Sequence, residues 1–322
     1  MPPIAVPHPG GIILNKTPSE ALMIQPQNHA VRQWLKGQIP GYFFLMPGFI
    51  FIFVFMIYPL FNSLYLSFCK YNFAFDPKPT FAGLENFTKM LSDSSFMVAF
   101  GNTMFFSVIF FALIMVLSLV IAIILDKKLP WSGFFRTSIF LPVVIPLSLS
   151  GIVFQWILNE NYGLLNFFLS DFLHLGFLAK NWLGDSQWAM LSLVGVSLWK
   201  YMGMLVVLYL AGLQSIPKEL YEAATVDGAS EWQKILKVIL PNLRETFVIC
   251  GIWSIIQSIK VFEQPFIMTQ GGPGTATLVL YQYTWENAFK FYEIGYASAM
   301  AYVMAAIILL LSFLNLKLSR TE

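Results

Sequence analysis

The sequence predicts an all-α, polytopic membrane protein with six transmembrane helices. The chain is too apolar for a soluble globular protein, because 57% of its residues are hydrophobic and only 11% are charged, and its mean hydropathy is +0.68. A helix needs roughly 20 apolar residues to cross the hydrocarbon core of a bilayer. Windows of that kind occur at 42–67, 99–125, 134–157, 189–213, 246–266 and 297–316.

The segment before the first window is polar and rich in proline, and we expect residues 1–40 to form a cytoplasmic arm, separate from a transmembrane domain over 41–322. The arm ends in NHAVRQWLKGQ, where Val31, Trp34 and Leu35 share one helical face. That pattern favours a helix lying at the membrane surface, with a disordered leader as the alternative. No basic stretch precedes an apolar run here, so a secretory signal peptide is not expected.

Two of the windows contain pairs of prolines. Pro47 and Pro59 lie in the first, and Pro142 and Pro146 lie in the third. Neighbouring helices can satisfy the carbonyls that a proline frees within a membrane, so we expect kinks in these spans rather than breaks.

The outer connections are short. FAGLENFTKMLSDSSF reads as an amphipathic helix, and the two stretches NYGLLNFFLSDFLHLGF and NWLGDSQW predict a capping segment after the third window. Four turn-forming residues in a row, Gly271 to Gly274, predict an irregular loop after the fifth window.

Basic residues are distributed unevenly between the connections. If the N-terminus is cytoplasmic, 12 of the 19 lysines and arginines fall on cytoplasmic segments: Lys16, Arg32, Lys36, Lys127, Lys128, Arg136, Lys218, Lys234, Lys237, Arg244, Lys317 and Arg320. The outer segments hold Lys70, Lys78, Lys89, Lys180 and Lys290, while Lys200 and Lys260 fall inside windows. The positive-inside rule therefore predicts that both termini are cytoplasmic.

The cytoplasmic connection between the fourth and fifth windows, about 214–244, is unusually polar. It contains YEAATVDGASEWQKILKVILP, in which Pro217 suits the first turn of a helix and Gly228 permits a left-handed turn. Ser230 and Gln233 have the spacing of a capping box, which starts a second helix. We expect Pro241 to mark the bend into the fifth span.

The two predicted helices of this connection differ in character. The second carries an apolar face formed by Trp232, Ile235, Leu236, Ile239 and Leu243. The first is slim, with Ala223 and Ala224 at its centre. A slim helix beside a capped neighbour suits docking in a groove of another protein, and a surface connector without a partner is the alternative.

The same stretch resembles the cytoplasmic-loop signature of permeases from binding-protein-dependent ABC importers. Matching positions are Glu222, Ala223, Ala224, Gly228, Val238, Leu240 and Pro241. Shorter segments, LAGLQSIPKELYEAATVDGA, YGLLN, KVFE and GYASAMA, resemble the carbohydrate subgroup of the maltose, trehalose and glycerol-phosphate type from about residue 40 to the C-terminus. Val238 stands where the family usually has isoleucine, and Glu245 stands near where many members carry a second proline.

The resemblance implies the fold of a type I ABC importer permease in a bacterial inner membrane. It implies that Tyr221, Glu222, Ala223, Ala224, Asp227 and Gly228 form a coupling helix that meets an ATPase. The chain has no G-x-x-x-x-G-K-[ST] phosphate loop, so ATP and Mg²⁺ are expected on a separate ATP-binding subunit, and this chain is not expected to be an enzyme. The implied partners are a homologous second permease subunit, two ATP-binding cassette subunits and an extracytoplasmic solute-binding protein, although a homodimer of permeases is not excluded.

Polar residues inside the windows are candidates for a substrate pathway, because such residues usually face a cavity or a bundle interior. The fifth window carries a stripe at helical spacing, and the third and fourth windows add further amides and aromatic groups that suit a sugar. The candidate residues are Gln155, Trp156, Asn159, Lys200, Tyr201, Trp253, Gln257, Ser258, Lys260 and Gln264. The alternatives are hydrogen bonds between helices and, for the two lysines, pairing with a carboxylate such as Glu263.

Other functions find less support in the sequence. Cys69, Cys250 and three histidines form no metal-ligand cluster, a net charge of +2 gives no indication of nucleic acid binding, and a membrane enzyme would need a paired acid and base that is absent. Half of an ion-coupled secondary transporter remains the alternative to an importer permease. The cargo stays open between neutral oligosaccharides, disaccharides, acidic oligosaccharides and glycerol phosphate.

Overall fold

The structure is a computed structural model that describes residues 44–127 and 130–320. The predicted arm over 1–40 and its surface helix lie outside these residues. The described chain divides into two compact units, one ending at Pro59 and the other beginning at Leu60. Helices dominate both, and β1 (Cys69–Lys70) and β2 (Thr80–Phe81) add a short antiparallel pair in the first outer connection.

The first predicted window is helical from Phe44 to Ser67. It includes η1 (Phe53–Ile57) and α2 (Tyr58–Ser67). Pro59 does not interrupt the helix: just before it, the Tyr58 N–H bonds to the Phe53 carbonyl five residues back, which makes one wide turn. The expectation that the prolines do not break this span is confirmed.

The second, fourth, fifth and sixth windows also lie within long helical segments. These are α4 (Ser94–Asp126), α8 (Ser186–Ser215), the pair α12 (Arg244–Ile259) and α13 (Glu263–Met268), and α15 (Ile294–Arg320). Each is long and apolar enough to cross a membrane.

The third window is broken rather than kinked. It forms α5 (Ser132–Val144) and α6 (Leu147–Ile157), whose axes differ by 103°. Ile145, which precedes Pro146, is extended with ψ 133°, because the proline ring disfavours the helical conformation in the residue before it. The prediction of a kinked but continuous span was therefore wrong here, and the described chain has five spans, or six if the bent pair is counted as one.

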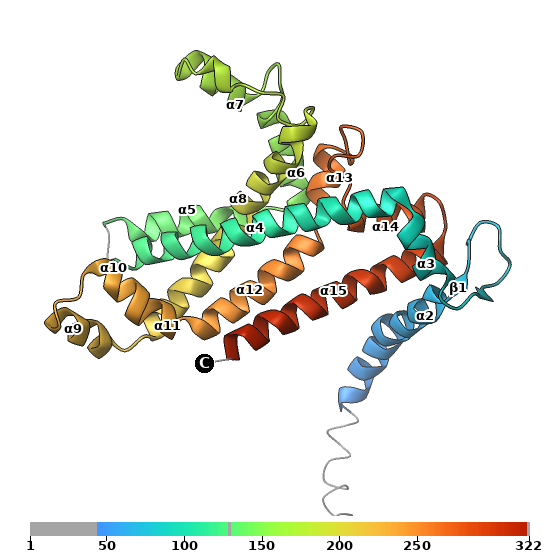
Figure 1. Cartoon of the computed structure of the whole chain (residues 1–322), viewed down its shortest axis with the longest axis horizontal. Coiled ribbons are helices and arrows are strands. Elements are labelled where there is room, and N and C mark those ends of the chain that lie inside the picture. The colour runs from blue at the N-terminus through green and yellow to red at the C-terminus, as the bar shows by residue number, and fades with distance from the viewer. Residues whose placement is uncertain (1–43, 128–129, 321–322) are drawn as a thin grey trace, which may run out of the picture. The chain divides into compact units, whose positions relative to one another are not determined.

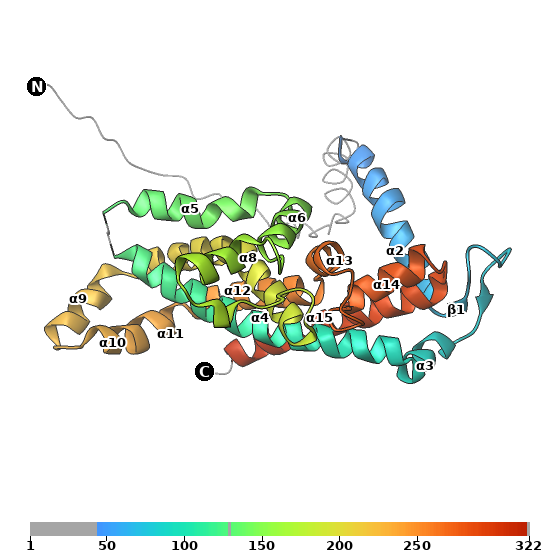
Figure 2. The same cartoon turned by 90° about the horizontal axis from the view of Figure 1, so that it is seen from above.

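The unit from Leu60 onward is built around α4 (Figures 1 and 2). This helix packs against α8 and α12, α5 packs against α8, and α15 packs against α12. The main apolar core lies between α4 and α8, with Phe110, Leu193, Leu205 and Tyr209 almost fully buried. A second core joins α12 and α15, around Ile259 and Met300.

The outer connections contain short helices. The predicted helix after the first window is α3 (Glu85–Ser92), and the predicted capping segment contains α7 (Leu164–Phe167), η2 (Phe168–Phe172) and η3 (Gly176–Leu178). Residues 269–279 form a non-helical loop, as expected. The loop is followed by α14 (Leu280–Phe289), a helix that the sequence reading missed.

Asp93 connects α4 to α14 and α15 at this end. Its carboxylate accepts hydrogen bonds from the hydroxyls of Tyr283 and Tyr296, both at 2.7 Å, and caps α4 through the N–H of Ser95.

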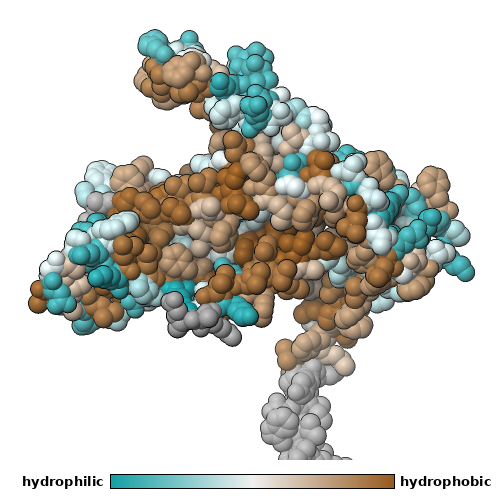
Figure 3. All heavy atoms as spheres, viewed as in Figure 1, coloured by the Kyte–Doolittle hydropathy of each residue, from teal (hydrophilic) through white to brown (hydrophobic). Residues whose placement is uncertain are grey.

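At the opposite end of α4 lie α9 (Lys218–Val226), α10 (Glu231–Lys234), η4 (Ile235–Ile239) and α11 (Leu240–Asn242). Figure 3 shows apolar side chains over the middle of α4 and α12, with hydrophilic residues near α9 and α10 and near α3. This is the pattern expected of a protein with a membrane-embedded middle.

Candidate functional site

The polar connection between α8 and α12 is a pair of helices with a tightly specified turn. α9 begins directly after Pro217, which is still extended, with ψ 134°. It ends in a Schellman arrangement, in which the Ala229 N–H bonds to the Ala224 carbonyl at 2.9 Å. Gly228 occupies the left-handed position with φ +74°. A helix that starts beside Pro217 and the left-handed conformation of Gly228 agree with the sequence prediction.

The start of α10 also agrees with the prediction. The Gln233 N–H donates to Ser230 Oγ at 3.3 Å, and the Ser230 N–H donates to Gln233 Oε1 at 2.8 Å, so both halves of the capping box are present. With the Schellman motif before it, this box leaves few free backbone groups in the turn. The two helices are therefore held at a defined angle.

The exposed side of this pair holds most of the predicted docking residues. Glu222, Ala223, Asp227 and Gly228 are exposed. A hollow of about 480 Å³ lies between the two arms, lined on one side by Ala223, Ala224, Asp227 and Gly228 and on the other by Gln233, Lys234 and Lys237. The small alanine side chains leave this surface open to close approach by another protein.

Tyr221 faces the body of the protein instead. Its ring packs against the main core, and its hydroxyl is buried without a hydrogen-bond partner. It lines a cavity of about 200 Å³ together with Asp126 and Leu213, at the ends of α4 and α8. Burial raises the pKa of Tyr221, and the charge of Asp126 raises it further. Tyr221 thus anchors α9 to the spans and does not belong to the exposed face.

Two further features tie the connection to the spans. Glu231 pairs with Lys234 at 3.1 Å and with Lys127, at the end of α4, at 3.3 Å, and hydrogen bonds from these two lysines hold the pKa of Glu231 below its usual value. The predicted apolar face is divided: Ile239 and Leu243 are buried, whereas Trp232 and Leu236 are exposed beside α4. The helix continues through Pro241, and the chain bends at Leu243 instead, where ψ is 6°.

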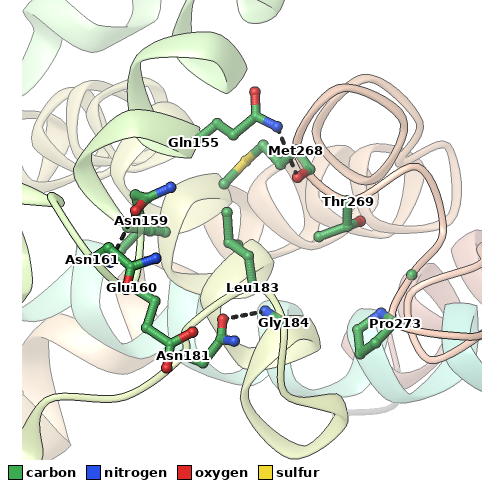
Figure 4. Close-up of a pocket in the computed structure, with 12 residues that line it drawn as sticks. Gln155, Asn159, Glu160, Asn161, Asn181, Leu183, Gly184, Met268, Thr269 and Pro273 are labelled. Carbon is green, nitrogen blue, oxygen red and sulfur yellow. Dashed lines mark hydrogen bonds between the residues drawn. The ribbon is translucent and has the colours of Figure 1, made fainter.

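A polar pocket of about 390 Å³ lies at the C-terminal end of the broken third span (Figure 4). It is formed by the end of α6, the loop before α8, and the end of α13 with the loop that follows. Its lining residues are Gln155, Leu158, Asn159, Glu160, Asn161, Asn181, Leu183, Gly184, Met268, Thr269, Gly272 and Pro273. Amide and carboxylate groups predominate among the polar ones, which suits a hydroxyl-rich ligand.

Hydrogen bonds order the walls of this pocket. Asn159 Oδ1 accepts from the Asn161 N–H at 2.9 Å, and Asn181 Oδ1 accepts from the Gly184 N–H at 2.7 Å. Gln155 Nε2 donates to the Met268 carbonyl at 3.5 Å, which links α6 to α13. Of the predicted pathway residues, Gln155 and Asn159 line this pocket, whereas Trp156 is 67% exposed and does not.

The predicted stripe of the fifth span is not continuous. α12 ends at Ile259 and α13 begins at Glu263, so Gln264 does not share a helix with Trp253 and Gln257. Trp253 stands edge-on to Tyr201, with ring centroids 5.4 Å apart. Gln257 is half-buried and Lys260 is exposed at the end of α12.

The remaining polar candidates are buried. Ser258 donates to the Ile255 carbonyl at 3.0 Å, whereas Gln264 is 1% exposed and its Nε2 has no hydrogen-bond partner among the described residues. Lys200 is 6% exposed and donates to backbone carbonyls of α5 and of Ile145, the residue that follows α5. The predicted pathway residues therefore fall into separate groups, with Gln155 and Asn159 at the pocket and Tyr201 and Trp253 in one aromatic contact.

Sequence reasoning missed several residues of the pocket. Glu160, Asn161, Asn181 and Thr269 all lie outside the apolar windows that were searched for polar side chains. The signal that could have found them is the run Asn159-Glu160-Asn161 just after the third window, together with Asn181 in the connection that leads to the fourth.

Comparison with known proteins gives consistent matches. The family described as "Binding-protein-dependent transport system inner membrane component" matches residues 114–321. The probable ABC transporter permease protein YurN of Bacillus subtilis (strain 168) is 37% identical over 288 residues, covering 89% of this chain and 98% of the relative. The sulfoquinovosyl glycerol transport system permease protein SmoG of Agrobacterium fabrum is 32% identical over 310 residues, covering 94% of this chain and 99% of the relative.

A solved structure has a similar fold. In a crystal structure of a bacterial ABC transporter involved in the import of the acidic polysaccharide alginate, one chain superposes with a TM-score of 0.79 at 22% identity. The match covers 91% of the present chain and 100% of the other. At this identity the likeness concerns the fold alone.

Proposed function

Because this chain belongs to the binding-protein-dependent transport system inner membrane components, we propose that it is the permease subunit of an ATP-driven importer for a sugar or oligosaccharide. The chain is a multi-pass inner-membrane protein, and its relatives are transport permeases rather than enzymes. The observation that carries the ATP-driven part of the proposal is the exposed, doubly capped α9–α10 pair between two long spans. Its face of Glu222, Ala223 and Asp227 is the surface that meets a separate ATP-binding subunit.

The proposed coupling follows from how α9 is attached. Tyr221 sits in a cavity between the ends of α4 and α8, and Glu231 pairs with Lys127 at the end of α4. A displacement of α9 is therefore transmitted directly to α4 and α8, and to α12 through the buried Ile239 and Leu243. ATP and Mg²⁺ belong to the partner in this scheme.

The proposed assembly contains a homologous second permease subunit, two ATP-binding cassette subunits and an extracytoplasmic solute-binding protein. The basic residues support an orientation with α9, α10 and both termini in the cytoplasm, since Lys127, Lys218, Lys234 and Lys237 lie at one end of the spans. The polar pocket beside α6 and α13 then opens toward the outer side, where a solute-binding protein releases its cargo.

A sugar cargo is supported by a relative and by the chemistry of the pocket. SmoG is a permease for sulfoquinovosyl glycerol. In this chain the pocket presents Gln155, Asn161, Asn181 and the carboxyl group of Glu160, which are groups that hydrogen-bond sugar hydroxyls. Substitution of Gln155 by alanine in the reconstituted importer is expected to weaken the apparent affinity for the sugar, and unchanged uptake of every sugar tested would remove the pocket from the pathway.

The experiment that tests the coupling is a charge reversal on α9. Glu222→Lys, in an importer reconstituted with its solute-binding protein and ATP-binding subunits, is expected to insert normally and to lose ATP-driven uptake. Glu219→Lys is the matched control, because Glu219 is exposed on the first turn of the same helix and precedes the predicted coupling residues, which begin at Tyr221. Wild-type uptake by Glu222→Lys, or equal loss in both variants, would contradict the coupling surface.

The same preparation separates an importer from an ion-coupled transporter. Uptake that requires ATP inside the vesicles and persists after an ionophore dissipates the ion gradients supports the importer. Uptake that follows the gradient and ignores ATP would support the secondary transporter.

A further inference from the structure

The break between α5 and α6 has a charged side chain at its centre. Lys200 lies in the middle of α8 and is 6% exposed. Its ammonium group donates to the Pro142 carbonyl at 2.8 Å, to the Val143 carbonyl at 3.2 Å, and also to the Ile145 carbonyl. None of the ion pairs between described residues involves Lys200. The positive charge is therefore balanced by backbone dipoles.

The carbonyls at the end of α5 have few donors within their own segment. The last carbonyls of any helix lack a partner four residues ahead. At this break Pro146 has no N–H to donate, and the Pro142 carbonyl accepts instead from the Ile145 N–H at 3.3 Å as well as from Lys200. Three ammonium hydrogens match three carbonyl oxygens, and a cation is favoured at a helix C-terminus by the helix dipole. Lys200 thus has the chemistry that a broken membrane helix requires.

The position of Gly203 supports the same arrangement. Gly203 lies one turn after Lys200 on α8, and a Cβ at this position would meet the backbone of Ile139 and Phe140. α5 therefore lies directly on α8 just before its end, which brings its last carbonyls within reach of Lys200. A longer side chain at 203 would move α5 away from the ammonium group.

The direction of α6 decides where the pocket forms. α6 turns away from α5 by 103° and packs on α13, where Gly151 lies against Ile267. This direction carries Gln155 and Asn159 to the Met268–Pro273 side of the pocket. If the span were straight, these two side chains would not reach it.

We infer that Lys200 is a positioning residue, which holds the broken third span open by binding the carbonyls at the end of α5 and thereby sets the sugar pocket, rather than a residue that contacts an anionic cargo. The inference rests on the proposed import function only for its uptake readout, because the geometry of the break can be measured independently of transport. Removal of the ammonium takes away the donor to the Val143 and Ile145 carbonyls and leaves the Pro142 carbonyl with the Ile145 N–H alone. The angle between α5 and α6 is then no longer defined, while each helix keeps its own bounds.

The test uses spin labels on the two arms of the break in the full importer. Labels at Thr137 on α5 and Val153 on α6 are placed on exposed positions, and Cys69 and Cys250 are buried, so labelling is selective. Lys200→Met should broaden the distance distribution and reduce uptake of neutral and anionic sugars alike by about tenfold, since several charge-assisted hydrogen bonds are lost. Lys200→Arg keeps charge and donors and should retain the wild-type distance. Lys180→Met, which removes an exposed outer lysine, is the control for charge alone.

A second variant keeps the test valid if Lys200→Met assembles poorly. Pro146→Ala restores an N–H four residues after Pro142, so the double variant Pro146→Ala with Lys200→Met should regain thermal stability without regaining the bent distance. An unchanged distance distribution in Lys200→Met would overturn the inference. So would a loss confined to anionic sugars, because that result would place the ammonium on the cargo. If no variant and no wild-type protein shows ATP-driven uptake, the proposed function fails while the distance measurement still decides the role of Lys200.

Discussion

Replacing Gly203 by alanine tests the contact between α5 and α8 on which the broken span depends. A Cβ at this position would lie 2.9 Å from Phe140 Cα and 3.1 Å from the Ile139 carbonyl carbon, and closer still to the carbonyl oxygen. These are backbone atoms, so they cannot rotate away as a flexible side chain would. Relief requires a shift of the whole of α5 relative to α8.

The expected magnitude combines two opposing effects. Alanine stabilises a helix interior by about 1 kcal/mol relative to glycine, whereas forcing an extra methyl group into a packed interface costs about 1–3 kcal/mol. At Gly203 the added methyl group would meet backbone atoms, so the second effect prevails and the free energy of unfolding should fall by up to about 2 kcal/mol. At Gly195, on the exposed side of the same helix, nothing lies within 4 Å of an added Cβ. Gly195→Ala should therefore leave stability unchanged or raise it.

The assay is thermal unfolding of the purified importer in detergent, followed by tryptophan fluorescence, for the wild type and the two alanine variants. Gly203→Ala should lower the midpoint and Gly195→Ala should not. If both variants shift the midpoint in the same direction by the same amount, α5 does not approach α8 as described. Uptake should fall only in Gly203→Ala, because only that variant disturbs the end of α5 beside Lys200.

Three further predictions concern the turn of the coupling pair and the Asp93 cluster. An alanine Cβ at Gly228 would meet no atom within 4 Å, but the backbone there has a left-handed φ of +74°, so Gly228→Ala should strain the turn by about 1–2 kcal/mol. Hydrogen exchange over 218–234 should then speed up. Gly228→Asn should have a smaller effect, because asparagine tolerates this conformation better. Ser230→Ala removes the capping box and should cost about 1 kcal/mol of local stability; unchanged exchange at the first turn of α10 would contradict this. Burial raises the pKa of Asp93, but hydrogen bonds from Tyr283, Tyr296 and the backbone together bring it below the ordinary value of 3.8. The ionised carboxylate therefore stabilises the fold fully above 3.8 and this contribution is lost as the pH falls through the lowered pKa, so the thermal midpoints of wild type and Asp93→Asn should converge at acidic pH; a constant gap would refute the assignment.

Features with short-range causes could be predicted from the sequence. The spans follow from apolar length, and the helix over Lys218–Val226, the left-handed Gly228 and the Ser230–Gln233 box follow from residues within four positions of each other. α14 was missed because its stretch mixes aromatic and polar residues without a clear period. Its start depends on a distant group, since the Leu280 N–H donates to Thr103 Oγ on α4 at 2.8 Å.

Roles of single polar residues could not be predicted in the same way. The resemblance implied that Tyr221 belongs to the coupling helix together with Glu222. Adjacent residues on a helix point about 100° apart, and Tyr221 packs inward. Lys200 was named among the candidates for the substrate pathway, with pairing to a carboxylate as an alternative. Its actual partners are carbonyls more than fifty residues earlier in the chain.

By itself, the sequence determined the class of the protein, the positions of its spans and the shape of its cytoplasmic helix pair, because hydrophobic length and capping act locally along the chain. Only the tertiary structure decided that the third span breaks by 103°, that Lys200 binds the freed carbonyls, and that residues from 155 to 273 meet in one polar pocket. The physical reason is that a helix end or a buried charge is stable only where another segment supplies its partner, and that partner is set by packing between helices distant in sequence.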